Sequence, residues 1–99
     1  MNKVTCYYVQ TSYYQNAKRT TLYKSQQSIE FAGEWYSQCH RGTYAFIKDD
    51  IVQSILANKT IEFNNVDDIT NKIIYTPATQ QKFEWAELQY KMRGHLNGN

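Results

Sequence analysis

The sequence has 99 residues, of which 41% are hydrophobic and 15% aromatic, and its formal net charge is +2. This length fits a single domain over residues 1–99, because two halves of about 50 residues would each bury too little surface. The small charge excludes mimicry of nucleic acid by a carboxylate-rich surface, which needs a strongly negative field. Mean hydropathy is -0.71, and no apolar run approaches the roughly 20 residues that cross a bilayer, so we expect no membrane partner.

The first residues contain no apolar block of the kind that forms a secretory signal. We therefore expect a cytoplasmic protein, in the host cytoplasm if the gene is carried by a phage. The two cysteines, Cys6 and Cys39, fall at positions where small apolar side chains are buried, so we expect free thiols rather than a disulfide.

The N-terminal third predicts a β-hairpin. Residues 3–14 alternate as a strand does, although neither face is plainly polar, and residues 20–24 have β propensity. The polar residues 15–19 between them predict the connection, which gives the hairpin a basic tip.

A helical period follows in residues 29–41. At 100° per residue one arc is continuously apolar, and Gly42 offers the left-handed residue that commonly ends a helix. This pattern predicts a helix that buries one set of side chains on the sheet. The set is Ile29, Ala32, Trp35, Tyr36 and Cys39.

The second half predicts shorter elements. We expect a strand over 43–48, a short helix opened by Asp49 and Asp50 and stopped at Asn58, and a strand over 60–63. Residues 66–76 fit either a helical turn or an edge strand, and Thr76-Pro77 is typical of a helix start, with Gly94 at the other end. The resulting order, ββαβαβ(β)α, predicts an α+β fold in which two to three helices pack on a small antiparallel or mixed sheet.

The last helix has two opposed apolar stripes. Trp85, Leu88 and Met92 form one, and Phe83 and Tyr90 lie on the opposite side. Because the first stripe is the more apolar, we assign it to the core. We then expect Phe83 and Tyr90, flanked by Lys82 and Arg93, to contact a protein target or a second copy in a homodimer. The alternative is that the same chain covers both stripes.

No pattern of residues indicates catalysis, a metal or a cofactor. Cys39 and His40 are adjacent, so on a helix their side chains diverge by about 100° and cannot form a dyad. The cysteines and histidines lack zinc-site spacing, and the aspartate pairs stand where helix starts favour negative charge. There is no glycine-rich phosphate loop or nucleophile elbow.

The predicted hairpin interleaves aromatic rings with cations, as single-strand nucleic-acid binders do. The residues concerned are Tyr13, Tyr14, Lys18, Arg19, Tyr23 and Lys24. The same feature also fits a hairpin tip charged for solubility. A small ribonuclease that uses His40, Arg41 and the hairpin cations is a further alternative, supported by composition alone.

By elimination, the sequence favours a non-enzymatic module that binds a protein. Aromatic residues exceed what one small core readily hides, as in inhibitors, immunity proteins and phage anti-defence proteins generally. The bias toward Asn, Gln, Lys, Ile and Tyr is compatible with an AT-rich bacterial or phage genome. We therefore expect an inhibitor of a host or rival macromolecule.

Overall fold

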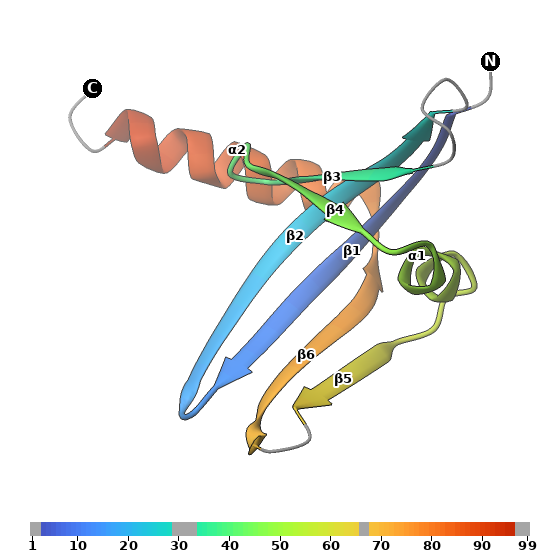
Figure 1. The fold of residues 1–99 in the computed structure, drawn as a ribbon. Coiled ribbons are helices and arrows are strands. Elements are labelled where there is room, and N and C mark those ends of the chain that lie inside the picture. The colour runs from blue at the N-terminus through green and yellow to red at the C-terminus, as the bar shows by residue number, and fades with distance from the viewer. Residues whose placement is uncertain (1–2, 29–33, 66–67, 97–99) are drawn as a thin grey trace.

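A computed structural model describes residues 3–28, 34–65 and 68–96. These residues form six strands and two helices (Figure 1). The elements are β1 (Lys3–Tyr14), β2 (Ala17–Ser28), β3 (Trp35–Cys39), β4 (Tyr44–Ile47), α1 (Asp49–Leu56), β5 (Ile61–Asn65), β6 (Asp68–Ala78) and α2 (Gln80–Leu96). The strands make one antiparallel sheet in the order β4-β3-β2-β1-β6-β5, and the fold is α+β as expected.

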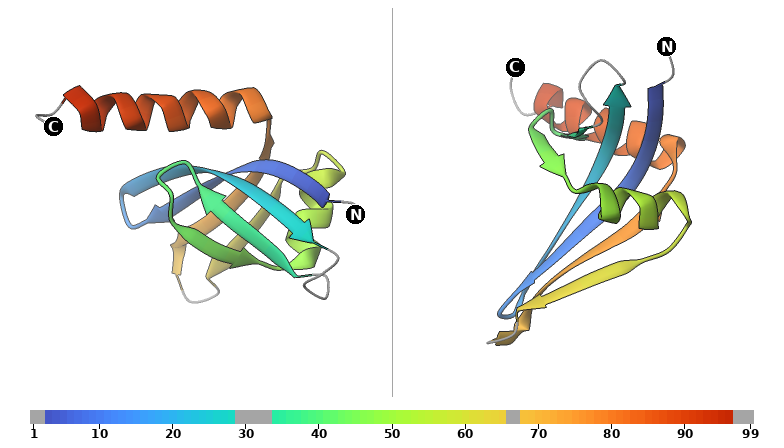
Figure 2. Two further views of the ribbon diagram at one scale, coloured as in Figure 1. Left: turned by 90° about the horizontal axis from the view of Figure 1, so that it is seen from above. Right: turned by 45° about the vertical axis from the view of Figure 1, so that its right-hand side comes forward.

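The two helices lie on opposite faces of the sheet (Figure 2). α1 connects the two edge strands, β4 and β5, and packs on the face toward which Cys6 and Tyr8 point. α2 follows β6 and lies on the other face, where its Phe83 ring meets Tyr7. We call these the α1 face and the α2 face.

β1 and β2 form a hairpin that is longer than predicted. Tyr14 pairs with Ala17, so the connection is only Gln15 and Asn16, and Lys18 and Arg19 belong to β2. Gln15 has a φ of 54°, in the left-handed region that a two-residue turn requires. Side chains alternate between the two faces along both strands, which explains why neither face of residues 3–14 looked polar.

The helix predicted over 29–41 is wrong where the structure tests it. Residues 29–33 lie outside the described part of the chain, and residues 35–39 form β3, paired with β2 and β4. Trp35 and Cys39 are buried as expected, but they share the α1 face, whereas Tyr36 points to the α2 face. Gly42, with a φ of 94°, turns the β3–β4 hairpin instead of ending a helix.

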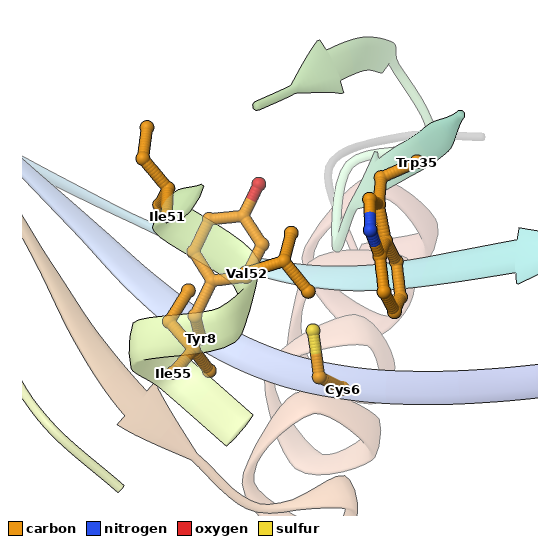
Figure 3. Packing of buried hydrophobic residues seen from close by; sticks show 6 residues of the cluster. All are labelled: Cys6, Tyr8, Trp35, Ile51, Val52 and Ile55. Carbon is orange, nitrogen blue, oxygen red and sulfur yellow. The ribbon is translucent and has the colours of Figure 1, made fainter. Parts of the chain in front are cut away.

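The core lies between α1 and the sheet, as Figure 3 shows from close by. Asp49 and Asp50 stand in the first turn of α1, and Asn58, with a φ of 61°, follows its end, both as predicted. The helix directs its apolar side toward the strands. Its side chains pack with those of β1 and β3 in one cluster, which comprises Cys6, Tyr8, Trp35, Ile51, Val52 and Ile55.

Polar groups inside this core are paired. The Tyr8 hydroxyl lies 2.8 Å from Ser37 Oγ, and Ser37 in turn bonds to Ser25 Oγ, both serines being fully buried. Trp35 Nε1 donates to Asp49 Oδ1 at 2.8 Å, which fixes the start of α1 over β3. These bonds satisfy groups that would be costly to bury unpaired.

The ambiguous segment 66–76 is mostly strand. Residues 66–67 lie outside the described part, and β6 runs from Asp68 through Pro77 to Ala78, so the expected helix start at Thr76-Pro77 is wrong. Pro77 lies opposite Tyr8 of β1, and on its other side β5 reaches β6 only as far as Tyr75, so on the β5 side no described strand requires an N–H from position 77. α2 also continues to Leu96, beyond the end predicted at Gly94.

The buried thiol of Cys6 predicts a loss of stability at alkaline pH. Burial raises its pKa from 9.0 to about 11, a rise opposed by a hydrogen bond with the Ser25 backbone. The unfolded chain releases this proton near its ordinary pKa while the folded chain retains it. We therefore expect the free energy of unfolding to fall as pH rises from about 9 to about 11, measured by urea denaturation across this range.

The control for this prediction is Cys6→Ala, which removes the thiol and keeps the position small and apolar. Burial also raises the pKa of the Tyr8 hydroxyl, so part of the alkaline loss persists in this variant. Its stability should nevertheless depend less steeply on pH than that of the wild type. Equal slopes in the two proteins would show that Cys6 does not contribute.

Candidate interaction surface on helix α2

α2 begins at a defined N-terminal cap. Thr79 Oγ1 accepts the backbone N–H of Lys82 at 3.1 Å, and the Thr79 carbonyl accepts that of Phe83 at 3.1 Å. Hydroxyl side chains favour this position because the first helical N–H groups have no partner within the helix. The cap fixes where α2 begins.

Phe83 is the residue that anchors α2. Its side chain is only 3% exposed, with its ring centroid 5.8 Å from that of Tyr7 and 5.9 Å from Lys24 Nζ. Two turns later the Tyr90 ring lies edge-on to His40, at 6.3 Å between centroids. Phe83 and Tyr90 therefore form the side of α2 that faces β1, β2 and the end of β3.

The opposite side of α2 carries an exposed apolar stripe, which we call the outer stripe. Trp85 is 61% exposed, Leu88 51% and Met92 48%. Our assignment of the two stripes is thus inverted: the more apolar stripe faces outward, and Phe83 is buried by its own chain. Tyr90 is half exposed at the edge of the helix–sheet contact, so part of its side chain remains accessible.

The charged residues beside the outer stripe differ in their partners. Lys91 Nζ lies 3.9 Å from Glu87 Oε1, and Gln80 Nε2 donates to Glu84 Oε1 at 2.9 Å. Lys82 and Arg93 are exposed on the opposite flank and form no ion pair within residues 3–28, 34–65 and 68–96. The outer stripe is therefore bordered by two free cations, one near each end.

Helical arithmetic identified both stripes but could not choose between them. Seven-residue spacing puts Phe83 and Tyr90 on one side, and three- and four-residue spacing puts Trp85, Leu88 and Met92 on the other. Choosing the more apolar set assumed that a helix buries its most apolar side. Thr79 marks the start of the helix, but a cap alone does not determine which side of the helix meets the sheet.

The six hairpin residues proposed to bind nucleic acid are divided between the two faces. Tyr13, Lys18 and Lys24 lie on the α2 face, and Tyr14, Arg19 and Tyr23 on the α1 face. On the α2 face, Lys18 and Lys72 place their Nζ atoms 5.9 Å and 4.9 Å from the Tyr13 ring centroid. On the α1 face, Tyr23 stacks on Tyr8. The structure therefore does not join the six residues into one surface.

Cys39 ends β3 and points to the α1 face with Tyr23, whereas His40, the first residue of the turn, places its ring against Tyr90 on the α2 face. Burial raises the pKa of the Cys39 thiol, but hydrogen bonds from Thr43 and from the Arg41 and Gly42 amides outweigh it and leave the pKa lowered. His40 Nδ1 accepts a hydrogen bond from the Leu22 backbone N–H at 3.3 Å, which holds the ring against β2. Both side chains therefore have structural partners, and they do not meet.

The α1 face contains a pocket of about 360 Å³ beside the core. Tyr23, Tyr75 and Phe63 contribute to its wall, and Lys48 and Asp50 stand at the start of α1. Tyr75 packs edge-on against Phe63 at 6.1 Å and tilts against Tyr8 at 5.8 Å. Within the described ranges, no three His, Cys, Asp or Glu residues cluster closely enough to hold a metal ion.

Comparison with protein-family models, curated proteins and solved structures finds no match for this chain. Among the described residues, no helix is long and apolar enough to cross a membrane. The candidate site therefore has to be argued from the geometry of the molecule itself.

Proposed function

We propose that this protein is a non-enzymatic protein-binding module that contacts an acidic protein target through the outer stripe of α2. The observation that carries the proposal is the exposure of Trp85, Leu88 and Met92 on the side of α2 that faces away from the sheet. A helix in a small domain usually turns its most apolar side inward. Here Phe83 packs α2 on the sheet, and no described residue covers the larger, outer stripe.

The composition of the stripe suits protein recognition. Tryptophan is among the residues that most often dominate binding energy, and aliphatic neighbours exclude water around it. The spacing of Trp85, Leu88 and Met92 at i, i+3 and i+7 is the pattern with which a helix fills an apolar groove. Trp85 would be the central anchor of such a contact.

The flanking charges favour an acidic target. Lys82 and Arg93 border the outer stripe and form no ion pair with described residues, whereas Glu87 is paired with Lys91 and Glu84 accepts a hydrogen bond from the neutral Gln80, so the unpaired charges on the helix are two positive and one negative. Complementary charges at the rim of an interface mainly raise the association rate and set specificity. The sequence nominated both residues for partner binding beside Phe83; we propose that they instead border a contact made by Trp85.

The biological role we propose is inhibition of a host or rival macromolecule, as in phage anti-defence and immunity-type proteins. A rigid sheet that presents a helix is sufficient to block a functional surface without any chemistry. Single-strand nucleic-acid binding and ribonuclease activity are the alternatives; the first would use Tyr13 with Lys18 and Lys72 on the α2 face.

The proposal is tested by isolating the target from bacterial lysate on immobilised protein and measuring its affinity with purified components. We expect Trp85→Ala to weaken binding at least tenfold, about 1.4 kcal/mol. Tyr14→Ala is the matched control, because Tyr14 is 62% exposed against 61% for Trp85 but lies at the hairpin tip. Lys82→Glu with Arg93→Glu should slow association and weaken its dependence on salt.

Binding that is lost equally in the Tyr14 and Trp85 variants, or retained in both, would contradict this use of α2. Circular dichroism of each variant distinguishes loss of contact from loss of fold. Since Trp85 contributes little buried area, its alanine variant should remain folded.

A further inference from the structure

The two edges of the sheet are built differently. At one edge, β5 carries Glu62, which lies 3.6 Å from Lys72 Nζ, and the pairing shifts register at Asn64 and Asn65. Charges and irregular pairing are the usual means of preventing a strand edge from pairing further. At the other edge, β4 has the sequence Tyr-Ala-Phe-Ile, with no charge, proline or register shift.

The backbone direction of β4 follows from the turn that precedes it. Cys39 N–H donates to the Thr43 carbonyl at 2.9 Å, so this pair is hydrogen-bonded across β3 and β4. Antiparallel pairing alternates, which directs the backbone groups of Ala45 and Ile47 toward β3. The N–H and C=O groups of Tyr44 and Phe46 therefore face the free edge.

The same two residues expose their rings. Tyr44 and Phe46 are each 74% exposed, the highest values among the large hydrophobic residues, and both project on the α2 face, where Phe46 tilts against Tyr36 at 5.2 Å. Backbone groups and aromatic rings that no described residue pairs or covers thus coincide at one strand. This is the combination that favours addition of another strand.

We propose that β4 pairs antiparallel with β4 of a second copy, which joins two sheets into one across a two-fold axis. The register that pairs both outward residues of β4 within the strand has Tyr44 of one copy exchanging backbone hydrogen bonds with Phe46 of the other, and the reverse. Ala45 then lies opposite Ala45 of the second copy, on the axis. The aromatic rings of both copies gather on the α2 face.

Charge complementarity identifies the occupant as a second copy rather than an unrelated peptide. Arg41 stands before β4, whereas Glu34, Asp49 and Asp50 lie near its C-terminal end with Lys48 as the only nearby described cation. Antiparallel self-pairing places the positive end of each strand beside the negative end of its neighbour. The strand is therefore complementary to itself in hydrogen bonds, apolar surface and charge.

The first test is sedimentation of the full chain over a range of concentrations. Because the strand is short, we expect a concentration-dependent dimer with a micromolar Kd. The double variant Tyr44→Lys with Phe46→Lys should be monomeric, since each new ammonium lies opposite another. Trp85→Lys is the control, because it places the same charge on an exposed apolar site away from β4 and should leave the dimer intact.

The second test locates the two-fold axis. Directly opposed residues of a pair without mutual hydrogen bonds have Cα atoms about 4.5 Å apart, within the range of a disulfide. Ala45→Cys should therefore give a covalent dimer under mild oxidation, whereas Ile47→Cys, which faces position 43 of the other copy, should not. A wild type that is monomeric at every concentration, or a dimer that survives the double lysine variant, overturns the proposal.

Discussion

Replacing Trp35 by alanine is expected to lower the free energy of unfolding by about 3 to 5 kcal/mol, measured by urea denaturation followed by circular dichroism. The indole is 2% exposed and fills the space between β3 and α1, next to Cys6 and Val52. It also holds the start of α1 through the 2.8 Å bond to Asp49. The substitution removes both the packing and this bond.

The matched control is Trp35→Phe, which keeps most of the ring and loses the indole N–H. Asp49 is exposed and can bond water instead, so the phenylalanine variant should be much less destabilised than the alanine variant. An alanine variant that unfolds at the same urea concentration as the wild type would show that the indole does not hold α1 on the sheet.

The second large effect is expected at Phe83. Phe83→Ala should cost about 3 to 5 kcal/mol, because the ring is 3% exposed between α2 and the sheet. Trp85→Ala, two residues away on the same helix, should change stability by about 0.5 kcal/mol or less, since its side chain faces outward. Thermal or urea unfolding of the two variants side by side measures this contrast.

Limited proteolysis adds a local readout to this pair. Loss of Phe83 should expose α2 to cleavage before the sheet unfolds, because Phe83 is the one buried side chain among residues 80–93 of α2. The reverse result, a destabilised Trp85 variant and a stable Phe83 variant, would mean that Trp85 belongs to the core, as the sequence had indicated.

The sequence was informative where the periodicity of a segment had one interpretation. The hairpin of residues 3–14 and its partner, the helix opened by Asp49 and Asp50 and the apolar C-terminal helix all follow from alternation, capping and helical spacing. The failure at residues 35–39 has a physical cause. Ser37 is buried through the hydroxyls of Tyr8 and Ser25, which belong to other strands.

Trp35, Ser37 and Cys39 are all buried on one face of β3. Because serine is polar, this alternation did not appear in the sequence, and a helical period fitted the apolar residues better. Burial of a polar side chain by partners distant in the sequence cannot be inferred from local pattern. Pro77 misled in a similar way: it resembles a helix start, and its place in β6 depends on where β5 begins along the neighbouring edge.

For the candidate surface, the sequence predicted the two apolar stripes of α2 but not which of them faces outward. Lys82, Tyr90 and Arg93 remain proposed contacts, and the existence of a second apolar stripe on α2 came directly from the spacing of its residues. Which stripe faces outward depends on the exit angle of the chain from β6 into the Thr79 cap, a tertiary property. The free edge at β4 was likewise beyond local pattern, since strand order is set by pairing across the whole chain.

The position of β1 beside β6 bears on the order in which the protein folds. The hairpins β1–β2, β3–β4 and β5–β6 join neighbouring segments, whereas β1 and β6 come from opposite ends of the chain. Closing that long loop is slow, and until β1 and β6 pair, the sheet face on which α1 packs is incomplete. A chain paused at this step would expose the unpaired edge of β1 and the apolar side of α1 together, which makes the late joining of β6 the stage most open to aggregation.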